Sequence, residues 1–471
     1  MRRTVLLLAL AVALSGPLHA QTATRISEAA INTASQLREQ ALHDQTGWNV
    51  VESLTTEVGP RLAGSEADAR AVTWAIARFK ALGYDKVWTQ PVTFPRWERR
   101  SESVQVLGGS SQSLHVTALG GSPGGTLEGE VVRFADLASL EAAPAGSLTG
   151  KIAYIDHTMA RARDGSGYGP SSRVRSRGPS AAIRAGATGY IMRSAGTDLH
   201  RNPHTGITRF DEGLTPIPSA ALSLPDAQQL TRLLALGPVR LRMALDCGWN
   251  GEYTSQNVIG EITGRSKPSE VVVIGGHLDS WDQGTGAIDD AAGVGITMAA
   301  GHLIGRLPKA QRPARTIRVI AFANEEQGLY GGGAYAASQA SNIRNHQIGA
   351  ESDFGAGRIY AFQAKVPDYA KPALKQIATA LAPLGIAWRA DGEACGPDVG
   401  PIAALGMACA GLSQDGTDYF DYHHTPDDTL DKIDPAALAQ NVAAYAVFAY
   451  LSADAQGDFG SAPKPAEGAA H

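Results

Sequence analysis

Cysteine is scarce in this chain. Cys247, Cys395 and Cys409 are the three cysteines among its 471 residues, and their spacing does not match a zinc ribbon. If the protein is exported, a disulfide can form, and Cys395 with Cys409 is the pair to test. Free buried thiols are the alternative, and the sequence does not decide between the two.

A strong charge of either sign is also missing. The chain carries 41 Lys and Arg against 46 Asp and Glu, a net charge of −5. Removal of the first 20 residues would take away two arginines, leaving 39 against 46 and a net charge of −7. Such mild acidity argues against nucleic acid as the main partner.

Long hydrophobic runs are rare. The apolar run over residues 5–14 follows two arginines and precedes a small residue, Ala20, which predicts a signal peptide over residues 1–20. The run is too short to cross about 30 Å of hydrocarbon, which needs about 20 residues. We expect no membrane anchor and no later membrane-spanning segment, so the protein is predicted to be secreted or periplasmic.

The remaining chain has the composition of a globular α/β protein, with 44% hydrophobic residues and 53 glycines. Residues 21–120 and 248–455 are predicted to form one discontinuous catalytic domain, with a mostly parallel sheet flanked by helices. Residues 121–247 hold none of the metal-type motifs and are predicted to be a β-rich inserted module. Within it, the Gly-, Pro- and Arg-rich segment 161–179 is expected to be a mobile loop. The tail, 456–471, is expected to be disordered.

A buried strand followed by two polar residues carries the most information. Residues 271–274 are apolar and mostly β-branched, and two glycines separate them from His277 and Asp279. Side chains two positions apart in an extended chain point the same way. His277 and Asp279 are therefore expected to face one spot at the mouth of a sheet, where open α/β sheets bind their ligands.

More histidines and carboxylates follow in the same kind of place. Asp289 and Asp290 come after a glycine-rich loop, Glu325 and Glu326 follow the apolar run 319–323, and further candidates are Glu351, Asp353, His423 and His424. Paired glutamates usually lie on a solvated helix face, but these directly follow a predicted buried strand. A two-metal hydrolase needs about five or six nitrogen or oxygen ligands and a carboxylate between metals about 3.5–4 Å apart. The series therefore predicts a metal hydrolase.

The wording and order of these motifs resemble the co-catalytic zinc aminopeptidases, peptidase family M28. The matching pieces are His277-Leu-Asp-Ser280, Gly286-Ala-Ile-Asp-Asp-Ala-Ala-Gly293, Asn324-Glu-Glu-Gln-Gly328, Glu351-Ser-Asp353, His424-Thr-Pro-Asp-Asp-Thr429 and Gly59-Pro-Arg-Leu-Ala-Gly-Ser65. The resemblance covers about 45–120 and 250–452. It implies a zinc-aminopeptidase, phosphorylase/hydrolase-like fold, and the inserted module resembles a protease-associated domain.

The resemblance also implies a ligand set for two zinc ions. His277 and Asp353 would bind one zinc, Glu326 and His424 the other, and Asp289 would bridge them. Glu351, two positions before Asp353, is the alternative for that one ligand.

Other side chains would support this ligand set. Glu325 would be the general base, and Asp279 would grip His277 and fix its tautomer. His423 would either stabilise the oxyanion or only pack. Asp428 would be a partner of His424. The family often has a cis peptide after the bridging aspartate, which here is Asp289–Asp290.

The function implied is an exported two-zinc exopeptidase that removes N-terminal residues from short peptides or dipeptides. A carboxypeptidase of the same family is the main alternative, but it would need an arginine cluster near the metals that the sequence does not place. Asp398, Asp415 and Asp418 are candidates for holding a substrate α-ammonium.

Two other classes and several properties stay open. A single-zinc glutaminyl cyclase would bind one metal, and a receptor-like relative would lack ligands that are present here. Cobalt or manganese would fit the same donors. The inserted module would control access to the cleft or mediate formation of a homodimer. The remaining histidines considered are expected to be surface or structural residues: His115, His157, His200, His204, His302 and His346.

Overall fold

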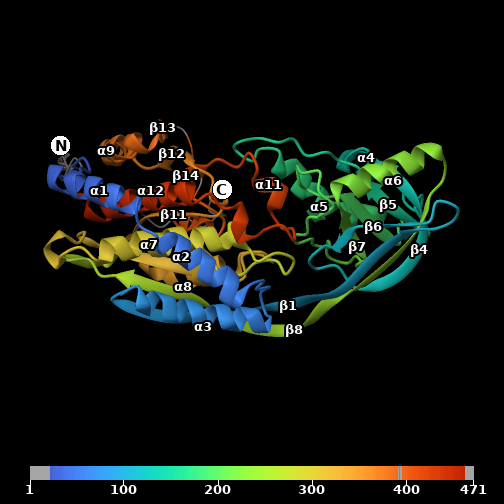
Figure 1. The fold of residues 1–471 in the computed structure, drawn as a ribbon, viewed down its shortest axis with the longest axis horizontal. Helices are drawn as coiled ribbons and strands as arrows, with labels where there is room; N and C mark the ends of the chain where they lie inside the picture. The colour runs from blue at the N-terminus through green and yellow to red at the C-terminus, as the bar shows by residue number, and fades with distance from the viewer. Residues whose placement is uncertain (1–21, 391, 393–394, 462–471) are drawn as a thin grey trace, which may run out of the picture.

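A computed structural model describes residues 22–461 except 391, 393 and 394. The predicted signal peptide and residues 462–471 lie outside the described residues. The molecule has two lobes, and two long strands run from one to the other (Figure 1). These are β1 (Lys86–Val106) and β8 (Arg240–Ile262), which pair antiparallel along their length within a 14-stranded sheet.

The larger lobe contains the predicted mostly parallel sheet. Its strands, in spatial order, are β13 (Ala387–Arg389), β12 (Ile359–Lys365), β14 (Ala408–Gln414), β11 (His346–Glu351), β9 (Lys267–His277), β10 (Arg315–Phe322) and β8. β10, β9, β11 and β14 run parallel to one another, whereas β8 and β12 join them antiparallel. Parallel strands that are buried on both faces have near-continuous apolar sequences. For this reason the residue types alone predicted the parallel strands of the larger lobe.

Helices cover both faces of this sheet because successive strand residues point to opposite sides. In β9, Val272 and Ile274 belong to one apolar core, and Val271 and Val273 belong to another. The first core is shared with α1 (Glu28–Ala41), α2 (Thr46–Ser53), α3 (Glu66–Ala81), α7 (Ala292–Gly305), α9 (Lys371–Leu381) and α12 (Pro435–Asp454). The second is shared with α8 (Tyr330–Gln339) and α10 (Gly400–Ala404).

Helix α12 corrects one expectation from the sequence. It is the one helix in the described part of the chain that is long and apolar enough to cross a membrane, so the prediction that no later segment qualifies is wrong by length and composition. In the structure 89% of its most apolar stretch is buried. A helix that is hydrophobic all round is typical of the centre of a core, and α12 packs against α1 and α7.

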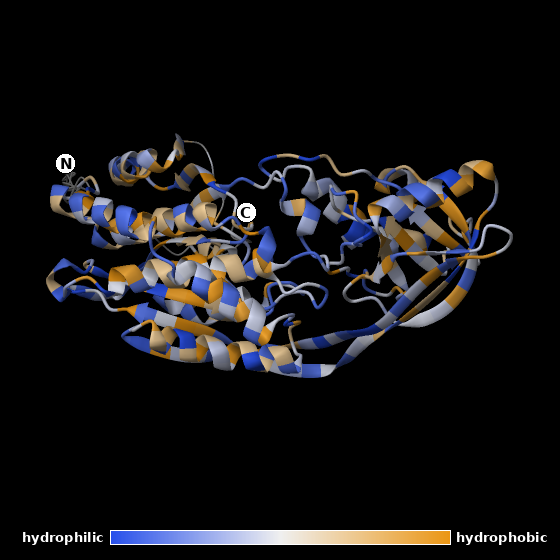
Figure 2. Ribbon diagram, viewed as in Figure 1, coloured by the Kyte–Doolittle hydropathy of each residue, from blue (hydrophilic) through white to orange (hydrophobic). Residues whose placement is uncertain are grey.

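The smaller lobe is an α/β unit with its own sheet. Its strands are β4 (Gly125–Phe134), β5 (Lys151–Ile155), β6 (Gly189–Arg193), β7 (Ser219–Leu222), β3 (Val116–Ala118) and β2 (Gln112–Leu114). Helices α4 (Leu137–Glu141), α5 (Tyr168–Arg184) and α6 (Leu224–Leu236) pack around them. In Figure 2 α6 carries both hydrophobic and hydrophilic residues, and its buried positions Ala227, Leu230 and Leu233 recur at helical spacing.

Two details of this lobe differ from the expectation. Its apolar core already includes Trp97 and Val104, upstream of the predicted boundary at residue 121, because β1 continues into the lobe. Segment 161–179 is not a loop throughout, since α5 begins at Tyr168. Pro170 lies in the first turn of this helix, where a proline is tolerated. The Gly and Pro content of the segment therefore led to the wrong prediction.

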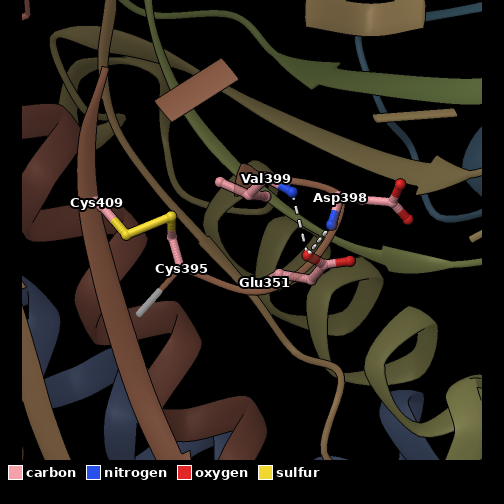
Figure 3. The surroundings of a disulfide bond; sticks show 5 residues. All are labelled: Glu351, Cys395, Asp398, Val399 and Cys409. Carbon is pink, nitrogen blue, oxygen red and sulfur yellow. Dashed lines mark hydrogen bonds between the residues drawn. A yellow bond between two sulfur atoms is a disulfide. The ribbon is translucent and has the colours of Figure 1, made fainter. Parts of the chain in front are cut away.

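The C-terminal segment and the disulfide complete the larger lobe. The prediction of disorder from residue 456 is wrong for 456–461: Gln456 pairs with Arg25, and Phe459 is fully buried. Cys395 and Cys409, the pair for which the sequence left a disulfide and free thiols equally open, form a disulfide (Figure 3), and Cys247 is a buried free thiol. The disulfide ties the segment before α10 to β14.

Glycine at the start of α7 allows a close approach that can be tested. A Cβ atom on Gly293 would lie 1.8 Å from the carbonyl oxygen of Ser352, whereas one on Gly333 in α8 would meet nothing within 4 Å. We expect Gly293→Ala to lower the free energy of unfolding by about 1–3 kcal/mol through overpacking. Gly333→Ala should raise it by about 0.5–1 kcal/mol. Urea denaturation measures both, and equal shifts would contradict the inferred close approach.

Candidate metal centre

The candidate residues meet at one edge of the larger sheet. Because β9, β10 and β11 are parallel, their carboxyl ends lie at the same edge. His277 is the last residue of β9, Glu325 and Glu326 follow β10, and Asp353 follows β11. The loop after β14 brings His423 and His424 to the same place through the short helix α11 (Tyr419–Tyr422).

Asp289 lies at the centre of the cluster. Its Oδ1 is 2.9 Å from Nε2 of His277, and its Oδ2 is 3.1 Å from Nε2 of His424. Glu326 Oε2 lies 2.9 Å from the same nitrogen of His424, and Asp353 Oδ1 lies 3.5 Å from Nε2 of His277. Two groups of side chains therefore share Asp289: His277 with Asp353, and His424 with Glu326.

The donor atoms suit divalent metal ions. All are imidazole nitrogens or carboxylate oxygens, the ligands that zinc accepts in mixed sites. Within each cluster of three such residues the atoms lie within 4.8 Å of one another, and His423 and Asp290 lie within reach as well. Oδ2 of Asp289 and Oε1 of Glu326 are buried without a hydrogen-bond partner among the described residues. Buried carboxylate oxygens that accept no hydrogen bond are costly unless a cation binds them, so the residues fit a metal pair.

Burial and mutual repulsion shift the charges in this cluster. Burial raises the pKa of Glu325 well above its usual range, and the carboxylates of Asp353 and Glu326 raise it further. Burial alone would lower the pKa of His277, but the surrounding carboxylates outweigh it and raise that pKa. The site is therefore a concentration of negative charge that attracts cations.

The carboxylates around the cluster hold backbone rather than metal. Asp279 accepts the N–H of Glu325 at 3.0 Å and of Glu326 at 3.4 Å. Its carboxylate also lies 3.6 Å from Nδ1 of His277, but its own carbonyl oxygen is closer, at 3.0 Å. The predicted contact between Asp279 and His277 is thus made chiefly through the backbone. The peptide bond Asp289–Asp290 is cis, as predicted.

Asp428 and Glu351 have structural partners. The prediction that Asp428 holds His424 is wrong: its Oδ1 accepts the N–H of Ile288 at 2.7 Å, and so supports the loop of Asp289. Glu351 accepts the N–H groups of Asp398 and Val399 at 2.8 and 3.1 Å (Figure 3). Glu351 is in none of the described ligand clusters, whereas Asp353 is.

His423 is stacked on His424, with ring centroids 3.5 Å apart. Its Nε2 lies 3.5 Å from Oδ2 of Asp289, and its Nδ1 is buried without a hydrogen-bond partner among the residues described. Burial and the neighbouring His424 lower the pKa of His423, so its neutral ring is favoured. Both alternatives predicted for His423 stay predictions: the neutral ring would stabilise an oxyanion through its N–H group, or it only packs.

Arg61, in the loop that precedes α3, holds the surrounding backbone. It is fully buried, and its guanidinium donates to the carbonyl oxygens of Leu278 at 2.6 Å, Thr285 at 2.6 Å and Gly286 at 2.9 Å. These carbonyls lie in the loop between His277 and Asp289. The N-terminal loop therefore fixes the backbone that carries two of the candidate ligands.

The smaller lobe contributes residues that sequence reasoning did not assign to the site. A cavity of about 440 Å³ lies over the cluster, and besides the candidate ligands its lining includes Tyr168, Ser172, Arg175, Ile207 and Arg209. Tyr168 stacks on Phe420 of α11, with ring centroids 4.7 Å apart, where α5 and α11 meet (Figure 1). These residues lie far from the motifs in the chain, and Tyr168, Ser172 and Arg175 fall within the segment 161–179 that was expected to be a loop, so no local signal marks them.

The chain has relatives of known family along most of its length. Residues 257–449 match the model of peptidase family M28. Carboxypeptidase Q of Mus musculus is 31% identical over 406 residues, covering 85% of this chain and 84% of that protein.

Solved structures support the same family assignment. A peptidase M28 precursor from Shewanella amazonensis is 49% identical with a TM-score of 0.89, covering 93% of this chain and 99% of that one. An aminopeptidase from Aneurinibacillus sp. shares the fold at 22% identity, with a TM-score of 0.62, covering 92% of this chain and 98% of that one. The chain belongs to peptidase family M28 and is a metallo-exopeptidase acting on peptides.

Proposed function

We propose that the protein is an exported exopeptidase that uses two zinc ions to remove the N-terminal residue of dipeptides and other short peptides. The observation that carries this proposal is the pair of ligand groups that share Asp289. One group would be completed by His277 and Asp353, and the other by Glu326 and His424. A carboxylate between two histidines can bind two neighbouring metals, one through each oxygen.

When bound, the zinc pair would lower the pKa of a water molecule to about 7 and polarise the peptide carbonyl. Glu325 lines the cavity but belongs to neither ligand group. Its main-chain N–H is fixed by Asp279, so the side chain is presented beside the ligand Glu326. Under this proposal Glu325 would accept the proton of the water and pass it to the leaving amine.

The cavity favours substrates with a free carboxylate near the cleaved bond. Arg175 donates to neutral acceptors, namely the carbonyl oxygens of Ile207 and Thr205 and the hydroxyl of Tyr168. Arg209 extends to the loop between β10 and α8, where its Nη2 lies 2.5 Å from the position that a Cβ atom on Gly328 would take. Neither guanidinium forms an ion pair with a carboxylate among the described residues. A dipeptide brings such a carboxylate within one residue of the scissile bond.

The three aspartates considered for the α-ammonium do not line this cavity. Asp398 is fully buried and accepts the N–H of Gly332 at 2.9 Å. Asp415 pairs with Arg163, and Asp418 pairs with Arg161, beside a neighbouring cavity of about 580 Å³. The structure therefore gives no support to the hypothesis that they bind the substrate amine.

A carboxypeptidase of the same family is the second candidate, because Arg175 and Arg209 supply the arginines that the sequence left unplaced. A dipeptide satisfies both candidates, so the two differ in whether a free N-terminus is required. The disulfide between Cys395 and Cys409 supports export, since disulfides persist mainly in oxidising compartments. The signal peptide predicted over residues 1–20 agrees with that location.

The role of Glu325 gives the first test of function. Glu325→Gln should lower kcat for free dipeptides by about 10²–10⁴-fold while both zinc ions stay bound, because the base is lost and the ligands are not. Chelation of the metals should abolish turnover by the wild type, and added zinc should restore it. Steady-state kinetics and metal analysis measure these effects. Glu128→Gln, an exposed change in the smaller lobe, is the control, and undiminished activity of Glu325→Gln would exclude the proposed base.

Arg209 gives the second test, which concerns the substrate. Arg209→Gln should raise KM for free dipeptides roughly tenfold, because a hydrogen bond to a charged group contributes about 1.5–3 kcal/mol. It should leave aminoacyl-nitroanilides, which lack the carboxylate, unchanged. Arg177→Gln, which alters an arginine of α5 that pairs with Glu141 of α4, is the matched control.

Acetylation of the substrate's N-terminus then separates removal of N-terminal residues from carboxypeptidase activity. Cleavage of free but not N-acetylated dipeptides would agree with removal of N-terminal residues. Cleavage of N-acetylated dipeptides alone would make the protein a carboxypeptidase and overturn the proposal.

A further inference from the structure

The smaller lobe makes direct contact with the loop that carries His424. Nδ1 of His204 lies 2.8 Å from the carbonyl oxygen of His423. The next residue, Thr205, donates its N–H to the carbonyl oxygen of His424 at 3.1 Å, and its own carbonyl oxygen lies 3.2 Å from Nδ1 of His424. Two consecutive residues of the smaller lobe thus hold both the backbone and the ring of the candidate ligand.

His204 is itself held firmly. Its Nε2 lies 2.9 Å from Oδ1 of Asp198, and both side chains are 1% exposed. The backbone N–H of His204 donates to the hydroxyl of Ser194 at 2.9 Å. Gly196 packs so closely that a Cβ atom there would lie 2.2 Å from Nε2 of His204. Both ring nitrogens face oxygen atoms, so the ring cannot turn without losing one of its contacts.

His424 needs such support for two reasons. The ring orientation of a metal-binding histidine is set by the partner of its second nitrogen, and here that partner is Thr205. In addition, the backbone of His424 has a φ of 60°, in the left-handed region that residues other than glycine seldom adopt. A strained backbone of this kind persists only where the surroundings hold it. Part of these surroundings, the contacts made by Thr205, belongs to the other lobe.

We propose that Asp198 and His204 are positioning residues for the zinc ligand His424, so that the smaller lobe completes the metal centre and does more than limit access to it. This inference rests on the proposed role of His424 in the preceding subsection. Asp198 orients His204, His204 fixes the carbonyl of His423, and the adjoining Thr205 fixes the ring of His424. The expected consequence is that zinc affinity depends on residues more than 200 positions away in the chain.

General docking of the lobes would be a different explanation. Arg161 also ties the smaller lobe to the same segment, through ion pairs with Asp418 at 2.8 Å and Asp421 at 2.6 Å. It touches neither His423 nor His424 in any contact between the described residues. Arg161→Gln therefore weakens the attachment of the lobes without altering the support of His424.

The test is zinc binding to the metal-free full chain, followed by calorimetry, in parallel with kinetics of the zinc-loaded enzyme. His204→Gln and the nearly isosteric Asp198→Asn should weaken one of the two zinc sites by about 10–100-fold and leave the other within twofold. With the site saturated by excess zinc, kcat should fall, while KM should stay within twofold. His115→Gln changes an exposed histidine of the same lobe whose Nδ1 faces the carbonyl of Arg201, and it is the matched control.

The outcomes separate the explanations. Weakening of one zinc site by Asp198→Asn but not by His115→Gln or Arg161→Gln supports the proposal, even if His204→Gln does not fold. Unchanged zinc affinities and kcat in a folded Asp198→Asn variant would overturn it. Equal losses in Arg161→Gln would also overturn it, in favour of general docking. If the wild type itself binds fewer than two zinc ions, the proposed function fails instead.

Discussion

Hydrogen bonds from backbone N–H groups to buried carboxylates organise this molecule. A buried carboxylate without a partner is costly, and many buried carboxylates lie together at one edge of the sheet. Four of them accept backbone N–H groups beside the candidate ligands: Asp279, Asp290, Glu351 and Asp428. Each fixes a loop next to a candidate ligand. Asp289 and Glu326 keep carboxylate oxygens without such partners and so remain available to cations.

The same division explains how the loops are held in place. Asp290 accepts the N–H groups of His277 and Gly293, joining the end of β9 to the start of α7. Arg61 adds the opposite arrangement, a buried cation surrounded by carbonyl oxygens of the loop between them. The side chains that would do the chemistry are therefore carried on backbone that is fixed from several directions. Such rigidity is what a metal centre needs to keep its donor atoms at a set separation.

The sequence was most informative where secondary structure and chemistry coincide. The apolar run before His277 and the run before Glu325 predicted buried strands, and the polar residues after them lie at one sheet edge because the strands are parallel. Contacts between distant segments could not be read in this way. Arg175 and Arg209 reach the cavity only through the folding of a lobe whose sequence around 161–179 resembles a loop. The partner of His424 was missed for the same reason: Asp428 is near it in sequence, whereas Thr205 is near it in space.

The paired course of β1 and β8 also bears on how such a protein can be altered. β1 carries the chain from the larger lobe into the smaller one, and β8 carries it back beside β1 in the antiparallel direction (Figure 1). Along the chain, the smaller lobe is therefore joined to the larger one through this two-stranded stem, and a lobe from a relative could be grafted there without rerouting the rest of the chain. A transplanted lobe would still have to bring its own contact to the loop of His424. The unit that can be exchanged in such a chimaera is therefore the lobe together with the loop it touches.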